Sequence, residues 1–241
     1  MVTLIYLLLG HWFLSLFCQS FFLHRYCSHH MFKMNKTWER VFYFLTYLTQ
    51  GPSFLNPESY ATLHQRHHKH SDKPQDPHSP SNHSSVMHMM MNTYHDYKAI
   101  LVEQKTRPDH KNEFSWNRLD KFAQSKYNTY LWVIIYCSLY YFLELPWWAY
   151  AALPLHFFVG PIQGAIVNWC GHKMGYRNFA TKDFSRNTLP IDFALMGELY
   201  QNNHHKFGQR LNFAHRWFEI DFTFLVAKVL NFLRIIKMKE A

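Results

Sequence analysis

The chain has 241 residues; it has no closely spaced cysteine pair, and two long stretches of it contain no basic residue. Its four cysteines are scattered with no CxxC pair, which argues against a disulfide framework and a zinc–thiolate site. No Lys or Arg precedes Arg25, and none lies between Lys126 and Lys173, although the formal net charge is +9. These two stretches are the most apolar of the chain. A nucleic-acid binder would interleave basic and aromatic residues, so the pattern indicates a membrane protein.

Other signals are missing as well. The first apolar run has no basic region before it and no small-residue cleavage site, so we expect no cleavable signal peptide. The chain shows no motif for haem, flavin or a ferredoxin-type cluster, so a redox reaction would need an external electron donor. The length fits one domain over residues 1–241.

Three apolar runs are candidates for membrane spans. Residues 2–23 are long enough to cross a bilayer as one helix. Residues 129–145 and 148–167 predict a hairpin of two spans, because Pro146 breaks the helix between them and a tryptophan pair suits a membrane interface.

Two shorter apolar segments suit the membrane surface. Residues 41–55 end in Gly51-Pro52 and are short for a span, so we expect an interfacial or re-entrant segment. Residues 222–236 are apolar but contain Lys228 and Arg234, which predicts a helix at the interface or over the functional site.

Histidine is abundant, with 18 residues, and part of it is regularly spaced. Residues at i, i+3 and i+4 share one helical face, so the HxxHH motif of residues 64–68 directs three imidazoles to one region. Residues 201–205, with Gln201 in the first position, repeat this spacing, and Asn168 and His172 are four apart. His24 and His29 are five apart and converge only if their helix distorts or ends between them.

These residues exceed the needs of one ion, so two adjacent metals are the economical interpretation. Neutral imidazole suits iron, zinc and copper. With no carboxylate or thiolate in the pattern, we expect the loaded site to be strongly positive. Of the other histidines, His11 and His156 lie in apolar runs and are interpreted as core residues; surface, capping or supporting roles are expected for His70, His78, His83, His88, His95 and His110.

The surroundings of these histidines resemble a known family. The stretches HRYCSH, HQRHHKHSDKPQDPH, NWCGHKMGYR and GELYQNNHHKF are similar to the membrane fatty acid desaturases, in particular a short, bacterial-like form of the acyl-coenzyme A delta-9 (stearoyl-type) branch. The resemblance covers about residues 20 to 235. It implies two iron ions (Fe2+) and an asparagine, Asn168, that acts through a bound water. The histidines that would hold the irons are His24, His29, His64, His67, His68, His172, His204 and His205. Gln201 stands where this branch usually has a ninth histidine, and its role stays open.

The resemblance also implies a reaction. It is the O2-dependent insertion of a cis double bond, at the delta-9 position, into a saturated long-chain acyl group carried on coenzyme A or a lipid. Electrons would come from a ferredoxin, a cytochrome b5 or a reductase-type partner. The basic residues Lys69, Arg177, Lys206 and Arg210 either contact the donor or the substrate phosphates, or only reflect membrane topology.

The expected fold is an all-α integral membrane protein with three transmembrane helices, interfacial helices and a histidine-rich di-metal cap. The histidine motifs must share one side, so 56–128 and 168–241 would be cytoplasmic, because Lys and Arg crowd that side. A bacterial inner membrane is the expected location. The alternatives are a di-iron hydroxylase or ketolase acting on a lipid, a histidine-rich metal transporter, and an inactive lipid-binding homologue.

Overall fold

The computed structural model describes residues 1–106 and 114–239, so His110 lies outside the described residues. The elements are α1 (Val2–Phe17), η1 (Cys18–Ser28), β1 (Phe32–Met34), α2 (Lys36–Gln50), η2 (Gly51–Ser53), α3 (Pro57–His70), η3 (Pro80–Asn82), α4 (Val86–Thr106), α5 (Asn117–Ala123), α6 (Lys126–Phe142), η4 (Trp147–Ala152), α7 (Leu153–Phe157), α8 (Val159–Lys173), α9 (Gln201–Lys206), α10 (Phe222–Phe232) and β2 (Ile236–Met238). The predicted helical fold is confirmed, apart from a small sheet in which β1 and β2 pair antiparallel with Lys33 opposite Lys237.

The first helix is the longest apolar element. Residues Val2–Ser28 form one run of 27 residues, which is long and apolar enough to cross a membrane on its own. Its first 16 residues are α-helical, and the following 11 residues form the π-helix η1. Exposed apolar side chains cover the α-helical part, whereas every residue of η1 is buried. The helix therefore changes from an outward-facing stem to a core element along its length.

A helical hairpin lies where two membrane spans were predicted, but only its second arm, which is bent, is long and apolar enough to count as a possible broken span. Among the described residues, Val2–Ser28 is the one single helix that meets these criteria, so the predicted number of three spans is not confirmed. Helix α6 ends at Phe142, before Pro146, and the chain returns through η4, α7 and α8. The two parts of the returning arm meet at an angle of 60° at Phe158. Proline lacks an N–H and is tolerated in the first turn of a helix, so Pro161 suits a helix that restarts after this bend.

The segment predicted to lie at the interface has a matching surface. Helix α2 begins at an N-cap where the Asn35 side chain accepts a hydrogen bond from the N–H of Trp38 at 2.9 Å. It ends before Gly51, which has φ +55°, a conformation that favours glycine. Its exposed apolar side chains recur at helical spacing and form one outward stripe: Val41, Phe44, Leu45 and Leu48.

The tail differs from its prediction. Helix α10 ends at Phe232, four residues before the predicted end, because Arg234 adopts φ +59° and the chain turns into β2. Strand β2 then pairs with β1, which follows η1 in the chain, and Ile236 is buried in the same core cluster as Phe21. The tail therefore braces the end of the first long helix.

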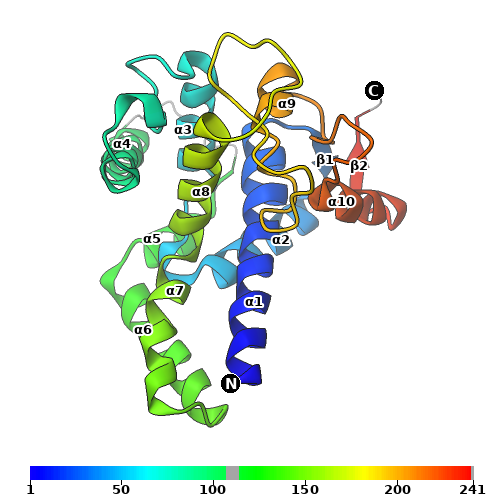
Figure 1. The fold of residues 1–241 in the computed structure, drawn as a ribbon. Coiled ribbons are helices and arrows are strands. Elements are labelled where there is room, and N and C mark those ends of the chain that lie inside the picture. The colour runs from blue at the N-terminus through cyan, green and yellow to red at the C-terminus, as the bar shows by residue number, and fades with distance from the viewer. Residues whose placement is uncertain (107–113, 240–241) are drawn as a thin grey trace.

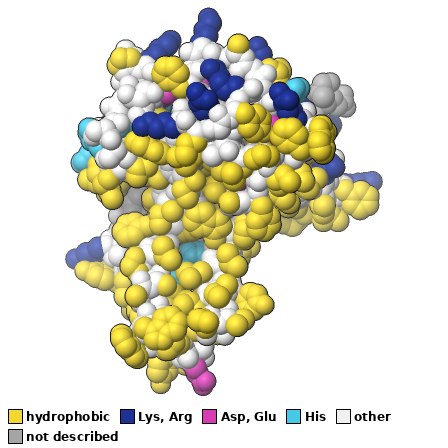
Figure 2. Space-filling model, in the orientation of Figure 1, with side chains coloured by type: hydrophobic (Ala, Val, Ile, Leu, Met, Phe, Trp, Pro, Cys, Tyr) yellow, Lys and Arg dark blue, Asp and Glu magenta, His cyan; other side chains and the backbone are white. Residues whose placement is uncertain are grey.

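Figure 1 shows how these elements position the site. The ends of η1, α3 and α8 and the short α9 meet at the top of the view, while the N-terminus and the turn after α6 lie at the bottom. In Figure 2, Lys and Arg gather on the upper part, and apolar side chains cover the surface below it. The polar end and the apolar stem are thus separated along the long axis.

Candidate metal centre

The π-helix explains how the first pair of histidines converges. Residues five apart lie about 140° from each other on an α-helix of 3.6 residues per turn, but the i→i+5 pattern of a π-helix brings them to nearly one face. His24 lies inside η1 and His29 caps it, and their ring centroids are 5.1 Å apart. The predicted distortion of the helix is therefore confirmed.

Helix α3 directs its histidines as the HxxHH spacing predicts. Its N-cap is Asn56, whose side chain accepts the N–H of Ser59 at 3.0 Å, and Pro57 occupies the first helical position. At the other end, Gln65 donates to the carbonyl of Ser28 at 3.1 Å and fastens α3 to the end of η1. Of the three imidazoles of this helix, those of His64 and His68 contact His29 of the first pair, while His67 faces His172 and His205.

The last histidines come from α8 and α9. His172 lies in the final turn of α8, and α9 carries His204 and His205. Helix α9 is held by Asn187, whose side-chain oxygen accepts the backbone N–H groups of Asn202 and Asn203 at 3.1 and 3.3 Å. The side chains of Asn202 and Asn203 add hydrogen bonds to the carbonyls of Phe179 and Phe213 at 3.0 and 2.8 Å, so both asparagines have a structural role.

Eight histidines predicted from the sequence meet in two adjacent groups. In the five-histidine group, one ring nitrogen of each member lies within 4.8 Å of those of all the others: His24, His29, His64, His68 and His204. In the three-histidine group, the same holds for His67, His172 and His205. The groups touch, because the rings of His68 and His205 are 4.6 Å apart.

Hydrogen bonding in the three-histidine group leaves a place for a cation. The Nδ1–H groups of His67, His172 and His205 each donate to a carboxylate at 2.9 Å, so in the neutral rings every Nε2 carries a bare lone pair. The Nε2 atoms of His67 and His205 are 3.2 Å apart, and Nε2 of His172 is buried without a partner. Converging lone pairs repel unless a positive ion lies between them, so this donor set fits a metal.

The five-histidine group fits a second metal. Four Nε2–Nε2 distances fall between 2.8 and 3.0 Å, in pairs that link all five rings. Metal–imidazole bonds of about 2.1 Å place adjacent ligand nitrogens of an octahedron about 3.0 Å apart. The observed spacing matches that value, and imidazole-rich donor sets suit iron, copper and zinc.

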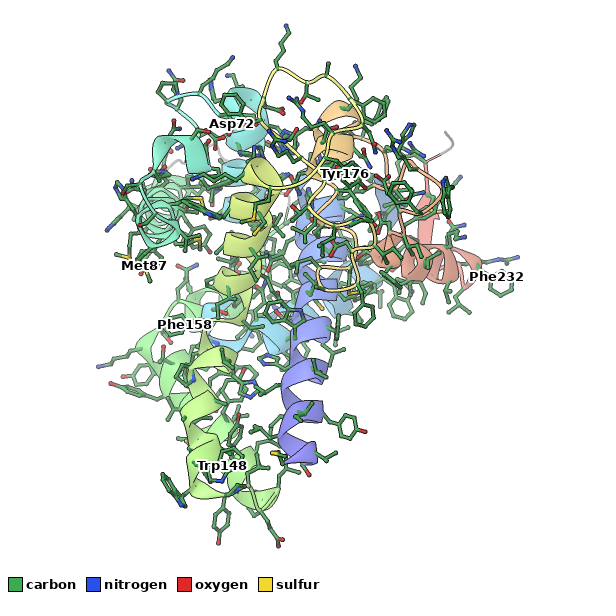
Figure 3. The ribbon with its side chains drawn as sticks, in the orientation of Figure 1. Asp72, Met87, Trp148, Phe158, Tyr176 and Phe232 are labelled. Carbon is green, nitrogen blue, oxygen red and sulfur yellow. The ribbon has the colours of Figure 1, made fainter. Side chains whose placement is uncertain are left out.

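Carboxylates behind the histidines are functional residues that the histidine spacing did not reveal. Asp76 accepts from His67, Asp72 from His172, Asp183 from His205, and Glu198 from His24 at 2.6 Å. Figure 3 places Asp72 at the polar end of the molecule, near the top of α8. The expectation of a strongly positive loaded site considered the ligands alone and did not include these four carboxylates, which place negative charge directly behind the histidines. Asp72, Asp76 and Glu198 lie within a few residues of the histidine motifs, which is the signal that could have identified them.

Burial governs the protonation of these groups. Burial, and then the charge of neighbouring histidines, lowers the pKa of His64, His67, His68 and His204 well below the ordinary 6.5. Burial alone would raise the pKa of Asp72, but the hydrogen bond and charge of His172 outweigh it and lower that pKa to about 2. The histidines are thus neutral and the carboxylate charged near pH 7, which is the state that binds a metal.

The two amide residues predicted to join the metal site lie on different helices, Gln201 on α9 and Asn168 on α8. Gln201 is buried, packs against Gly171 of α8, and donates its amide to the carbonyl of Glu198 at 2.7 Å. Asn168 lies one turn before His172 on α8. Gln201 therefore stands between α8 and the Glu198 that supports His24.

His78 was expected at the surface or in a capping or supporting role, and the structure excludes the surface. It is 5% exposed, its ring lies 4.5 Å from that of His67, and its Nδ1 is buried without a partner. Its backbone N–H donates to Asp76 at 3.2 Å. His78 therefore supports the carboxylate that holds His67.

The core role expected for His11 and His156 is confirmed. Their Nδ1 atoms are 2.6 Å apart, Nε2 of His11 lies 2.6 Å from the carbonyl of Thr49, and the Tyr140 hydroxyl lies 2.9 Å from Nε2 of His156. A single neutral tautomer for each ring satisfies all three contacts, with Thr49 accepting, His156 donating to His11, and Tyr140 donating. The pair ties α1, α2, α6 and α7 together.

The four basic residues proposed as contacts lie at the polar end and are exposed: Lys69, Arg177, Lys206 and Arg210. Arg177 has a structural task, since it donates to the backbone oxygens of Thr181 and Asp183 at 3.1 and 3.0 Å. It therefore supports the loop that carries the Asp183 carboxylate.

Comparisons with known proteins agree with this centre. The family model described as "Fatty acid desaturase" matches residues 1–225. The chain is 30% identical over 236 residues to the hex-5-enoyl-[acyl-carrier protein] acetylenase of Moorena producens, with 89% of this chain and 70% of the relative covered. It is 27% identical over 214 residues to the sn-1 stearoyl-lipid 9-desaturase of Anabaena variabilis, with 87% and 74% covered.

A further relative is the acyl-CoA C20 Delta5-desaturase of Anemone leveillei, which is 29% identical over 214 residues, with 87% of this chain and 65% of the relative covered. The names of these relatives differ in acyl carrier and in the position of the bond, while the family model spans nearly the whole chain. The chain therefore belongs to the fatty acid desaturase family of oxidoreductases.

Proposed function

We propose that the chain is an O2-dependent desaturase that introduces a cis double bond, at the delta-9 position, into a saturated long-chain acyl group. The observation that carries the proposal is the pair of adjacent, buried histidine groups whose Nε2 atoms converge. Removing hydrogens from an unactivated methylene chain offers no acidic proton and no leaving group, so acid–base catalysis is insufficient. A reduced metal pair that activates O2 supplies the required oxidising power.

The overall reaction consumes one O2, two electrons and two protons, and it converts a CH2–CH2 unit into CH=CH with two molecules of water. The five-histidine group would hold one Fe2+ and the three-histidine group the other. Asn168 is proposed to join the three-histidine group through a water, and the role of Gln201 stays open between a ligand and a supporting residue. If Gln201 is not a ligand, Gln201→Ala should reduce activity less than His204→Ala does, and equal losses would make Gln201 a full ligand.

The protein's own residues prepare the site. Asp72, Asp76, Asp183 and Glu198 accept the Nδ1–H of their histidines, which fixes each ring in the tautomer whose Nε2 is free. The side chains of His24, His67 and His172 are buried, with 3% exposure or less, so bulk water is kept away from the histidine end of the molecule. The apolar stem below the histidines provides the surroundings that a fatty acyl chain requires.

We also propose the membrane arrangement. The apolar stem would cross the bilayer with three spans near 2–23, 129–145 and 148–167, α2 would lie at the interface, and the histidine end would face the cytoplasm. The support is the separation of charged and apolar surfaces along the long axis (Figure 2). A reporter tag at residue 75 should show cytoplasmic exposure in a bacterial inner membrane, and a periplasmic signal would overturn the arrangement.

The proposed partners follow from the reaction. The relatives' names include carrier protein, lipid and CoA substrates, so the acyl carrier of this chain is proposed as CoA or a lipid and needs a direct test. An external electron donor of the ferredoxin, cytochrome b5 or reductase type is required. The exposed cations Lys69, Lys206 and Arg210 at the polar end suit an acidic donor or the phosphates of a substrate.

Gas chromatography–mass spectrometry of fatty acids tests the proposal. Cells that express the chain together with an electron donor should contain a cis-monounsaturated acid that is absent from cells expressing His67→Ala. The fragmentation pattern fixes the position of the double bond. A hydroxylated or keto lipid instead would indicate the hydroxylase or ketolase alternative, and metal uptake without any O2-dependent product would indicate a transporter.

A further inference from the structure

The carboxylates are divided unevenly between the two histidine groups. Every member of the three-histidine group donates to a carboxylate of its own, at 2.9 Å in each case: Asp76, Asp72 and Asp183. In the five-histidine group, His24 is the only member with such a partner among the residues that the structure describes, and this partner is Glu198 at 2.6 Å. The three-histidine group therefore carries three negative charges directly behind its ligands, and the five-histidine group carries one.

The one carboxylate of the five-histidine group is also shared with a cation. Arg25 is fully buried, forms an ion pair with Glu198, and forms a second with Asp221 at 2.8 Å. Its guanidinium stacks on Phe213 at 3.9 Å from the ring centroid, which fixes its position. The charge that reaches His24 through Glu198 is therefore partly neutralised.

No such cation serves the other group in the described part of the chain. The remaining hydrogen-bond donors to its three carboxylates are neutral hydroxyls and backbone N–H groups, supplied by Asp72, His78, Ser79, Thr181, Phe184 and Ser185. Arg177 reaches the Asp183 carboxylate only through the Thr181 hydroxyl, so none of the three carboxylates forms a direct ion pair with an Arg or Lys of the described residues. A carboxylate that accepts an Nδ1–H increases the basicity of the ring and its strength as a ligand.

We infer that the two metal positions are electronically unequal, and that the three-histidine group is the position that favours the trivalent ion. Asp72, Asp76 and Asp183 are the positioning residues that produce this preference, while Arg25 keeps the five-histidine group suited to the divalent ion. The inference rests on the proposed function, because it needs two bound irons. It ranks the two positions by the negative charge behind their histidines. By that measure the three-histidine group is the more negative, although the five-histidine group has more ligands.

Mössbauer spectroscopy of the full chain loaded with 57Fe tests this inference. Partial chemical reduction to one ferric and one ferrous ion per chain gives two separate doublets. Asp72→Asn keeps a side-chain oxygen that accepts the N–H and removes the charge; it should change the quadrupole splitting of the ferric doublet and leave the ferrous one. Glu198→Gln should change the ferrous doublet and leave the ferric one.

Two controls keep the outcomes distinct. Asp183→Asn repeats the test from another loop if Asp72→Asn lowers iron content, and His95→Ala, at an exposed position, should change neither doublet. A ferric doublet that moves only with Glu198→Gln, or doublets that move together in every variant, would overturn the inference. A wild-type chain that fails to bind two irons would instead contradict the proposed function.

Discussion

At the scale of single residues, four of the eight proposed histidine ligands depend on a carboxylate on their far side: His24, His67, His172 and His205. His67 shows this most clearly, because its ring is 1% exposed, its Nδ1–H is fixed by Asp76, and His78 stacks against it. Replacing His67 removes a ligand and also takes one of the hydrogen-bond donors from the buried Asp76 carboxylate, which in the described part of the chain then keeps only the backbone N–H groups of Asp72 and His78.

We therefore expect His67→Ala to abolish desaturation and to lower bound iron to about one ion per chain, with at least a hundred-fold loss of activity, the upper end expected for an altered metal shell. Product analysis and elemental analysis of the purified protein measure the two effects. The matched control is His95→Ala, since His95 is exposed on α4. Full activity of His67→Ala would remove the metal assignment.

The sequence was informative about ligands because their residue type and spacing are unusual. Eight of the histidines at motif spacing meet in the structure, including His24 and His29, whose separation required a distorted helix. The supporting residues were harder to recognise, because Asp183 and Arg25 are common residue types without a spacing rule. Their roles depend on tertiary contacts with residues 22 and 173 positions away in the chain.

At the scale of elements, the packing of α9 against α8 is expected to control the proposed metal position at the three-histidine group. Gly171 faces Gln201 so closely that an added Cβ would overlap Cγ of Gln201. Both elements carry ligands of the three-histidine group, so a shift between them separates His172 from His205. Overpacking of this kind costs about 1–3 kcal/mol.

Gly171→Ala should therefore reduce the metal content and the activity together. The control is Gly164→Ala on the same helix, where the nearest side-chain atom, Nε2 of Gln19, would be 3.7 Å from the new Cβ, an ordinary contact. Thermal unfolding and elemental analysis of both variants measure the difference. Equal behaviour of the two variants would show that the α8–α9 contact does not position the ligands.

Element boundaries were less predictable than element types. The apolar run at 148–167 predicts one straight arm, but its backbone bends at Phe158 because local proline and packing decide where a helix restarts. The tail predicts a helix to residue 236, but pairing with β1 takes its last residues into a strand. Such long-range pairing leaves no periodic signal in a segment of three residues.

At the scale of the whole molecule, burial of four histidines of the site makes the stability of the fold depend on pH. The folded-state pKa values of His64, His67, His68 and His204 lie well below 6.5, so the folded apoprotein resists protonation there. The unfolded chain binds protons as the pH falls below about 6.5. Stability is thus unaffected by these groups above that pH and falls progressively below it.

Lowering the pH from about 7.5 to about 5 should consequently lower the melting temperature of the apoprotein and release metal from the loaded protein, because protons and metal compete for the same lone pairs. Differential scanning fluorimetry and elemental analysis after gel filtration at each pH measure these effects. A melting temperature and metal content that stay constant over this range would contradict the assigned protonation states.

Eight histidines are proposed to form two metal positions at the polar end of an apolar stem. The most direct test is the iron content of the purified wild-type chain, measured by inductively coupled plasma mass spectrometry against protein concentration by amino acid analysis. The account predicts about two irons per chain. A wild-type chain that binds one iron or none under iron-replete, reducing conditions would contradict it.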